Sequence, residues 1–285
     1  MKEKLAEEYL KLPRKQLEVV LDKAEIELGG FFDESTKMFM ENFGKIDLIV
    51  RMKFYNDFAT KTDNQIESLF QTWVKTHFPN HNVYGEEYGD KTDKVSDWIW
   101  AIDPIDGTTN YKNGNPECAI VVSLRFKDFP VLSVVKFPIK NDIYKTRIFS
   151  EVTLNGNKSV PSSETNLKTS LVSVNYLNHS ERMIIMAGKL WDEVGGVHMK
   201  MCSLAEACDV VSGKLQAALL YELGPHEWPA IYLLAKQSGC LMEPMAEPGS
   251  EFSIEGLGNR SFIIAANEKI MKSLNGLVGL PPKLN

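Results

Sequence analysis

The 285-residue sequence predicts a mixed α+β / α/β protein built from two layered halves. In the first half, helical periodicity is followed by a run of strand-like segments. In the second half, helix-like and strand-like segments alternate. The polar stretch VPSSETNLKT (160–169) separates them. We therefore expect an N-terminal α+β subdomain over residues 1–160 and a C-terminal α/β subdomain over residues 161–285.

The first half opens with two predicted helices. Apolar residues recur at helical spacing over residues 14–43, although the glycine pair at 29–30 could bend or split this helix. A second amphipathic helix is predicted over residues 63–77. The next segment, FPNHNVYGEE (78–87), indicates a turn and a short strand.

Strand-like segments fill the rest of the first half. DWIWAID (97–103) does not alternate, which is typical of a strand covered on both faces. CAIVVSLRF (118–126) and PVLSVVKFP (130–138) predict neighbouring strands. IYKTRIFSEVTLNG (143–156) predicts that the meander continues to an Asn-Gly turn.

The second half has an alternating pattern that favours an α/β arrangement. Three of its segments predict strands: SLVSVNY (170–176), AALLY (217–221) and SFIIAAN (261–267). Three others predict helices: SERMIIMAGKLW (180–191), SLAEACDVVSG (203–213) and PAIYLLAKQSG (229–239).

Composition excludes several classes of partner. The net charge of −6 argues against binding to nucleic acid or to an anionic membrane surface, since both are recognised by basic patches. No apolar run approaches the roughly 20 residues that span a bilayer, and MKEKLAEEYLKL lacks the apolar core of a secretory signal. The four cysteines are too sparse for a disulfide framework and lack zinc-type spacing. We expect a cytoplasmic protein with reduced thiols.

Two aspartates end the Trp-rich segment. Asp103 and Asp106 lie in DPIDGTT, where Pro104 fixes one backbone angle and Gly107 permits a tight turn. Two carboxylates with no thiol or imidazole nearby suit Mg²⁺. Asp-Pro and Asp-Gly are also common turn dipeptides, so this segment alone leaves a metal site and a solvated turn both open.

Three further residues join this constellation. Glu86 lies in GEE, after an extended segment that could bring it beside the aspartates, although such a pair is also typical of a solvated loop. Thr108 supplies a hydroxyl that can position a water. Asp63 begins the second predicted helix, either as its N-cap or as an acceptor for that hydroxyl.

Several motifs together resemble one family. DFATKTDNQIE, FPNHNVYGEE, WIWAIDPIDGTTNY, FPIKNDIY and LNG occur in the order and at the spacing found in the inositol monophosphatase family. The chain is identified as a member of it on these motifs. The resemblance implies a layered αβαβα sandwich of the inositol monophosphatase / fructose-1,6-bisphosphatase type. It also implies a lithium-sensitive homodimer with two or three Mg²⁺ ions per site, for which Mn²⁺ is a possible substitute.

The resemblance also implies a set of site residues. It assigns metal binding to Glu86, Asp103, the carbonyl oxygen of Ile105, and Asp106. It assigns catalysis to Glu86 and Thr108, which orient the attacking water, and to Asp63, which supports the Thr108 hydroxyl. Exposed N–H groups at a helix start would receive the phosphate. The residues assigned to phosphate and substrate are Ile105, Asp106, Gly107, Thr108, Thr109, Ser203 and Glu222.

The downstream metal acid departs from the family pattern. The segment that resembles Pro-Trp-Asp-x-Ala-Ala is GPHEWPAIYLLAKQSG, in which Glu227 takes the place of Asp and His226 the place of Trp. We expect Glu227 to be the last metal ligand, although an acid at a helix N-terminus is also favoured by the helix dipole alone. His226 is expected to pack or line the rim, because the site is rich in oxygen.

The substrate side departs further. MCSLAEA (201–207) replaces the usual Gly-Ser-Ala-Ala, so Met201 stands where the family has glycine. Lys200 is the only basic residue offered in place of an arginine common just before it. Glu222 resembles an acid that binds substrate hydroxyls, but a surface loop acid is an equal alternative.

The leading hypothesis is a Mg²⁺-dependent phosphomonoesterase for a small polyol phosphate, with inositol monophosphate as the default substrate and no covalent intermediate. Histidinol phosphate, fructose 1,6-bisphosphate and 3′-phosphoadenosine 5′-phosphate are alternatives. The bisphosphates rank lower, because residues 195–227 offer only Lys200 and Lys214 for a second phosphate. Another hypothesis is a catalytically weakened member that serves as a binding protein. A calcium module is disfavoured, since there is no EF-hand spacing.

Overall fold

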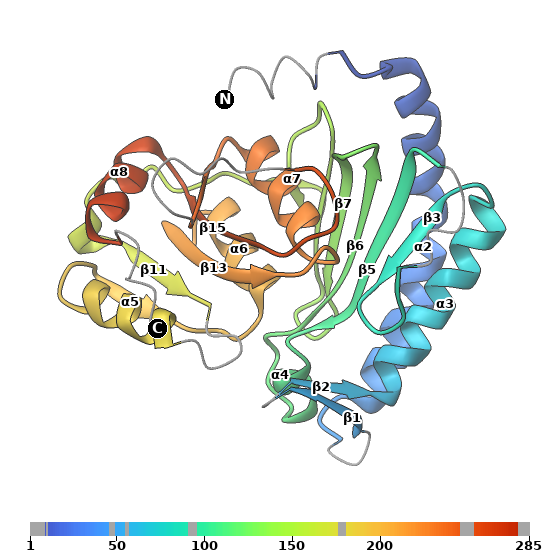
Figure 1. Ribbon diagram of the computed structural model, residues 1–285, viewed down its shortest axis with the longest axis horizontal. Helices are drawn as coiled ribbons and strands as arrows, with labels where there is room; N and C mark the ends of the chain where they lie inside the picture. Colours follow the sequence, from blue (N-terminus) through green and yellow to red (C-terminus); the bar gives the residue numbers. More distant parts are fainter. Residues whose placement is uncertain are drawn as a thin grey trace.

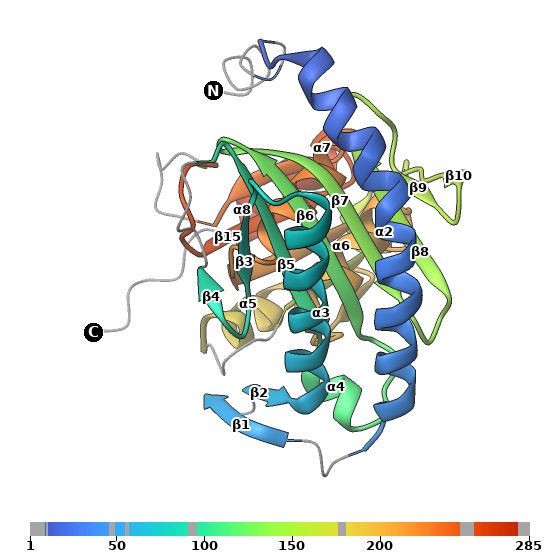
Figure 2. The same ribbon diagram turned by 90° about the vertical axis from the view of Figure 1, so that its right-hand side faces the viewer.

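The structure is a computed structural model that describes residues 9, 11–45, 49–54, 57–90, 96–175, 181–245 and 254–278. Its elements stack in five layers, helix, sheet, helix, sheet, helix (Figures 1 and 2). The predicted α+β layered class is confirmed. In the described part of the chain, no helix is both long enough and apolar enough to cross a membrane.

The first layer holds α2 (Arg14–Asn42) and α3 (Lys61–His77). The glycine pair at 29–30 does not split α2, because neither glycine has a left-handed backbone conformation. Helix α3 begins two residues before the predicted start. Its N-cap is Thr60, and Asp63 is the third helical residue that completes a capping box with it. The interpretation of Asp63 as the N-cap is therefore wrong.

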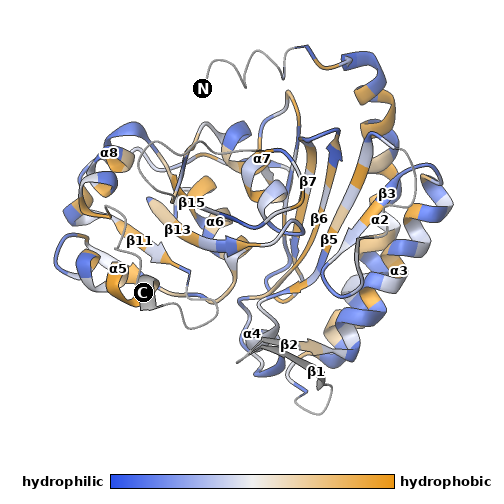
Figure 3. Ribbon diagram, in the orientation of Figure 1, coloured by the Kyte–Doolittle hydropathy of each residue, from blue (hydrophilic) through white to orange (hydrophobic). Residues whose placement is uncertain are grey.

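The large sheet has eight strands in the order β10-β9-β8-β7-β6-β5-β3-β4, antiparallel throughout except for the β3–β5 pair. Its central strands are apolar along most of their length, since helices cover both faces (Figure 3). The strands are β3 (Asn82–Gly85), β4 (Gly89–Asp90), β5 (Trp98–Asp106), β6 (Ala119–Phe126), β7 (Phe129–Phe137), β8 (Asp142–Arg147), β9 (Thr153–Leu154) and β10 (Asn157–Lys158).

Strand β5 continues through the segment that the sequence predicts as a turn. It runs to Asp106, and the turn begins only at Gly107. Between Asp103 and Asp106, three steps along β5 match two steps along β6, which is a β-bulge. Residues three apart on a regular strand face opposite sides. The extra residue in the bulge therefore lets both carboxylates point to the same side of the sheet.

The third layer holds α6 (Ser203–Val211) and α7 (Trp228–Ser238), packed between the two sheets. The second sheet has the order β12-β11-β13-β15-β14. Its strands are β11 (Leu171–Val174), β12 (Gly196–His198), β13 (Ala217–Leu223), β14 (Leu241–Pro244) and β15 (Arg260–Ala265). The last layer holds α5 (Glu181–Trp191) and α8 (Glu268–Leu277).

Smaller elements connect these layers. Strands β1 (Ile49–Phe54) and β2 (Asp57–Thr60) form a separate hairpin ahead of α3, and α4 (Thr108–Lys112) follows β5 directly. The polar stretch at 160–169 contains only the 3₁₀ turn η2 (Leu167–Thr169). One apolar core cluster runs from α2 through the large sheet to α6, α7 and the near face of the second sheet. The division at residue 160 into two subdomains stays a prediction.

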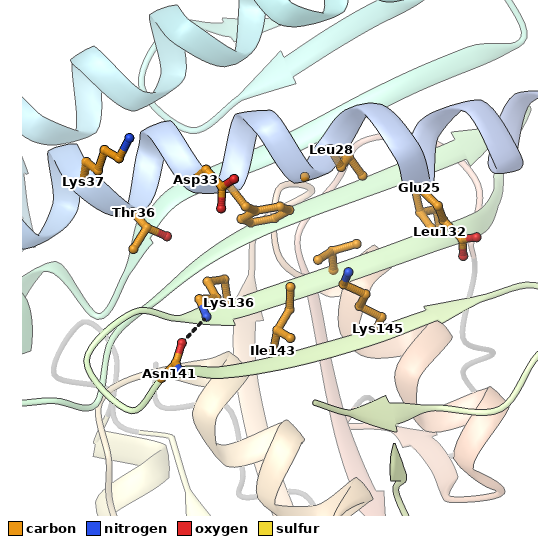
Figure 4. A pocket seen from close by; sticks show the side chains of 13 residues that line it. Glu25, Leu28, Asp33, Thr36, Lys37, Leu132, Lys136, Asn141, Ile143 and Lys145 are labelled. Carbon is orange, nitrogen blue, oxygen red and sulfur yellow. Dashed lines mark hydrogen bonds between the residues drawn. The ribbon is translucent and has the colours of Figure 1, made fainter. Parts of the chain in front are cut away.

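A groove of about 540 Å³ lies where α2 crosses β7 and β8 (Figure 4). Its floor is apolar, with Leu28 on the helix and Leu132 and Ile143 on the strands. Charged side chains, among them Asp33 and Lys136, stand along its sides. None of its lining residues belongs to the predicted site, so the groove is separate from the acidic constellation.

Candidate metal centre

Carboxylates from distant segments converge beside the end of β5. One oxygen from each of Asp103, Asp106 and Glu227 lies within 4.8 Å of the others, and all three side chains are buried. Glu86, Asp103 and His226 form a second group whose ligand atoms meet the same limit. Asp103 belongs to both groups. The structure therefore brings three predicted acids, Glu86, Asp106 and Glu227, close to the Asp103 carboxylate.

The N-terminus of α6 fixes the Asp106 carboxylate. The backbone N–H groups of Leu204 and Ser203 donate to Asp106 Oδ2 and Oδ1 at 2.7 and 3.2 Å. The thiol of Cys202 donates to Oδ2 at 3.0 Å. The free N–H groups and the dipole at a helix start stabilise an anion there. The divergent segment MCSLAEA thus keeps a structural role, because it anchors a predicted metal ligand.

The longer side chain of Glu227 is accommodated by folding back on its own loop. Glu227 Oε2 accepts a hydrogen bond from the Gly224 N–H at 2.8 Å, and Oε1 accepts one from the Ser203 hydroxyl at 2.6 Å. That hydroxyl also lies 3.3 Å from Asp106 Oδ2. Ser203, predicted for the substrate side, therefore links two acids, and Glu227 remains in the Asp103–Asp106 group despite its extra methylene.

A buried acid on α3, which the sequence analysis did not single out, holds the segment that carries Glu86. Glu67 accepts hydrogen bonds from the backbone N–H groups of Glu87 and Tyr88 at 2.8 and 3.1 Å. Gly85 leaves room for this carboxylate, since a Cβ there would lie 1.7 Å from Glu67 Oε1. Its position four residues after Asp63, on the same helix face, was a usable signal in the sequence.

The predicted contact between Asp63 and Thr108 is not formed. Asp63 Oδ2 accepts hydrogen bonds from the backbone N–H and the hydroxyl of Thr60, whereas the Thr108 hydroxyl donates to the Ile105 carbonyl oxygen at 2.9 Å. The capping box therefore competes successfully for Asp63. Its Oδ1 is buried without a hydrogen-bond partner. The catalytic roles of Asp63 and Thr108 and metal binding by the Ile105 carbonyl stay predictions.

Burial and mutual repulsion disfavour the charged forms of these acids. Burial raises the pKa of Asp106 to about 6 and the pKa of Glu227 to about 7. Burial, together with the charges on Glu86 and Asp106, raises the pKa of Asp103 well above its usual range. Carboxylates this close in a low-dielectric site ionise together only when a cation compensates them. The electrostatics of the group therefore favour a bound cation.

The predicted phosphate side begins directly after Asp106. Gly107 is the N-cap of α4 and has a left-handed backbone with φ of +83°. A Cβ at this position would lie 2.7 Å from the Glu117 carbonyl oxygen, so glycine is required for both reasons. Thr108 and Thr109 are the first two residues of α4. The backbone N–H groups predicted to receive phosphate thus lie at a helix start next to the acids, and phosphate binding by them stays a prediction.

The lysines of the substrate side are engaged in ion pairs. Lys200 Nζ pairs with Asp209 and lies 3.4 Å from Glu117 Oε2, and Glu117 also pairs with Lys140 at 2.7 Å. Lys214 lies 3.5 Å from Asp209. Three lysines therefore share two carboxylates, so the protein itself offsets most, but not all, of this positive charge.

The backbone near these lysines keeps a glycine-type conformation at one departure from the family pattern. Met201 has φ of +55°, a conformation that favours glycine. The Asn110 side chain donates to the carbonyl oxygens of Lys200 and Met201 at 2.7 and 3.3 Å and holds this strained turn. The turn thus keeps a glycine-type geometry without the glycine.

Glu222 is the predicted site residue that the structure does not bring to the acids. It is exposed, has φ of +54°, and lies at an irregularity in the pairing of β13 with β15. Among the residues described, the groups of converging ligand atoms do not include it. Substrate binding by Glu222 stays a prediction.

Comparison with known proteins gives consistent matches. Residues 31–278 match the profile described as the inositol monophosphatase family. A Neisseria meningitidis protein named "Putative Nus factor SuhB" is 26% identical over 244 residues, which cover 84% of this chain and 91% of that protein. The Escherichia coli protein named "Nus factor SuhB" is 24% identical over 223 residues, covering 77% and 81%.

Solved structures share the fold. An IMPase of Thermotoga maritima superposes with a TM-score of 0.76 at 19% identity, covering 86% of this chain and 92% of that one. A structure described as an IMPase/NADP phosphatase complexed with Mg²⁺ and phosphate gives 0.79 at 20% identity, covering 94% and 97%. These likenesses confirm the layered αβαβα arrangement.

Proposed function

Because this chain belongs to the inositol monophosphatase family, we propose that it is a divalent-metal-dependent phosphomonoesterase for a small polyol phosphate, with inositol monophosphate as the first substrate to test. The observation that supports this most is the convergence of Asp103, Asp106 and Glu227 within 4.8 Å in a buried site. A protein gains nothing in stability from three apposed buried carboxylates unless something positive binds between them.

The donor set fits a hard divalent cation such as Mg²⁺. Carboxylate oxygens are the ligands that Mg²⁺ prefers, and it uses few of them because it keeps several waters. Asp103, Asp106 and Glu227 would hold one ion, and Glu86 with Asp103 a second. Bound divalent cations lower the pKa of a water and offset the charge on phosphate oxygens.

The chain supplies the groups that orient a nucleophilic water. The Thr108 hydroxyl donates a hydrogen bond to the Ile105 carbonyl oxygen, which leaves the Thr108 oxygen able to accept a hydrogen bond from that water. Glu86 takes up the proton that the water loses and acts as the base. The backbone N–H groups at the start of α4 bind the phosphate, as expected for a helix N-terminus. No covalent protein nucleophile takes part.

The ion pairs of the substrate side favour a substrate with a single phosphate. A second phosphate needs cationic side chains that are not already neutralised. Lys200 is paired with Asp209 and Glu117, and Lys214 with Asp209. We therefore rank inositol monophosphate and histidinol phosphate above fructose 1,6-bisphosphate and 3′-phosphoadenosine 5′-phosphate.

A phosphate-release assay over these four compounds, with Mg²⁺ and with a chelator, tests the proposal. We expect Mg²⁺-dependent release from a monophosphate. Asp103→Asn should abolish it, while the matched variant of an exposed acid, Asp192→Asn, should not. Release that persists in the chelator or in Asp103→Asn would refute the metal-dependent mechanism.

A binding role is the second candidate. The relatives named Nus factors, together with the altered Met201 and Glu227 positions, favour it. A folded protein that binds divalent cations but releases no phosphate from any of the four compounds would support this candidate over the first.

Lithium sensitivity and a homodimeric state are further proposals that rest on the family resemblance. Inhibition by millimolar LiCl in the same assay and the mass measured by light scattering test them. Release unaffected by lithium, or a monomeric mass, would refute the respective proposal.

A further inference from the structure

An imidazole lies among the carboxylates of the candidate metal centre. A ring nitrogen of His226, an oxygen of Glu86 and an oxygen of Asp103 all lie within 4.8 Å of one another. The sequence analysis expects a site with oxygen ligands only, in which His226 packs or lines the rim. The family resemblance puts tryptophan here, and an indole N–H can only donate a hydrogen bond. His226 therefore adds a nitrogen lone pair that can bind a metal ion, which the tryptophan of the family pattern lacks.

The protein holds this ring in place on two sides. A Cβ on Gly224 would lie 2.2 Å from His226 Cε1 and 2.7 Å from Nδ1, so the ring rests directly against a backbone that carries no side chain. The Tyr84 ring stacks nearly parallel to it, at an interplanar angle of 7° and a centroid distance of 6.4 Å. Only 17% of the His226 side chain is exposed. The imidazole is thus built into the site rather than left at its edge.

The ring also has an unused nitrogen. His226 Nε2 lies 3.5 Å from Glu227 Oε2, whereas Nδ1 is buried and has no hydrogen-bond partner. A buried polar atom without a partner is unfavourable, because it has lost its hydrogen bonds to water. The unpartnered Nδ1 is an observation independent of the acids. A metal ion that accepts a nitrogen lone pair of this ring would give the imidazole a partner.

We propose that His226 is a metal ligand together with Glu86 and Asp103, and that this mixed nitrogen–oxygen site prefers a first-row transition dication such as Mn²⁺ or Co²⁺ to Mg²⁺. Imidazole nitrogen binds transition dications well, whereas Mg²⁺ prefers oxygen alone. The Asp103–Asp106–Glu227 group keeps only oxygen donors. The two groups that share Asp103 therefore differ in the metal they favour. The proposal deepens the proposed metal-dependent function, since it concerns the same carboxylates.

Pulsed electron paramagnetic resonance of the Mn²⁺-loaded protein tests the proposal directly, because it detects a coordinated ¹⁴N nucleus. We expect ¹⁴N modulation in the wild-type protein, its loss in His226→Gln, and its retention in the matched variant of an exposed histidine, His198→Gln. Absence of the modulation in the wild-type protein, or its persistence in His226→Gln, would overturn the proposal. The wild-type measurement needs no variant to fold.

Calorimetric titration separates the metals. In His226→Gln the affinity for Co²⁺ should fall by about 10-fold or more, while the affinity for Mg²⁺ changes little. An equal loss for both metals would overturn the proposed preference. These readouts do not depend on catalysis. A protein that shows the nitrogen signal but releases no phosphate would refute the proposed function and leave this inference standing. An enzyme that releases phosphate but lacks the nitrogen signal would refute this inference and leave the proposed function standing.

Discussion

Gly85→Ala should disrupt the segment that carries Glu86, although alanine suits a strand better than glycine does. The added Cβ would lie 1.7 Å from Glu67 Oε1, and real contacts of this kind are not shorter than 3.0 Å. The carboxylate must therefore retreat by at least 1.3 Å, the difference between these two distances. Glu67 is fully buried, so water cannot replace what it loses.

The cost follows from the hydrogen bonds that the retreat breaks. Glu67 accepts from the N–H groups of Glu87 and Tyr88 at 2.8 and 3.1 Å. A hydrogen bond to a charged group contributes about 1.5–3 kcal/mol. Losing both should lower the free energy of unfolding by about 3 kcal/mol or more. Glu86 lies within this segment, so the affinity for divalent cations should fall as well.

Urea unfolding followed by circular dichroism measures the first effect, and calorimetric Mn²⁺ titration the second. In the matched variant Gly30→Ala, the new Cβ meets nothing within 4 Å on an exposed helix face. It should stabilise the protein by about 0.5–1 kcal/mol. In a Glu67→Ala background, Gly85→Ala should cost little, because the clash is gone. The reasoning would be refuted if Gly85→Ala lowered the free energy of unfolding as much in the Glu67→Ala background as expected in the wild type, or did not lower it in the wild type.

Ser203→Ala removes the 2.6 Å hydrogen bond to Glu227 and should weaken divalent-cation binding by about 10-fold in calorimetry. The matched variant of an exposed serine, Ser68→Ala, should leave binding unchanged, and an equal effect in both would contradict this. In the metal-free protein the folded pKa values of Asp106 (about 6) and Glu227 (about 7) exceed the unfolded values of about 4. The stabilisation from their protonation is complete below about pH 4 and is lost as the pH rises through 6 and 7, so the thermal midpoint in a chelator should be lower at pH 8 than at pH 5. Asp106→Asn should reduce this difference, and a midpoint that rises over the same range would be inconsistent with it. Lys200→Met should lower the free energy of unfolding by about 2 kcal/mol. This is less than the 3–5 kcal/mol lost when a buried charge is left fully unpaired, because Asp209 still has Lys214 as an ion-pair partner. The Lys200→Met variant should leave the KM for a monophosphate unchanged, and a raised KM would show that this lysine binds substrate.

The long elements of the fold could be predicted because their periodicity is local. The apolar spacing of residues 14–43 and the unbroken apolar runs of β5 to β7 each specify one type of element. The short strands β2, β4, β12 and β14 could not be predicted, since so short a strand forms only where a partner strand offers hydrogen bonds. The extension of β5 through Asp106 was missed for a related reason, because its bulge exists only in register with β6.

The site residues also divide into those that a local motif identifies and those whose contacts depend on distant parts of the chain. The motifs GEE and DPIDGTTN identify Glu86, Asp103 and Asp106 from the chain alone, because acids next to turn-forming residues are a local signal. The hydrogen bonds that position these acids join residues far apart in sequence. Leu204 reaches Asp106 across 98 residues, and Glu67 reaches Tyr88 across 21. A local pattern can mark a residue such as Glu67 as a candidate, but it does not predict which distant group that residue will contact.

The sequence by itself determined the layered class, the family, and the residue types that could bind a cation. Only the tertiary structure decided that the bulge turns Asp106 to the same side as Asp103, that Glu227 folds back to join them, and that the His226 ring lies among the acids. The physical reason is that periodicity and turn chemistry act within a few residues, whereas convergence of charges depends on how separate layers pack.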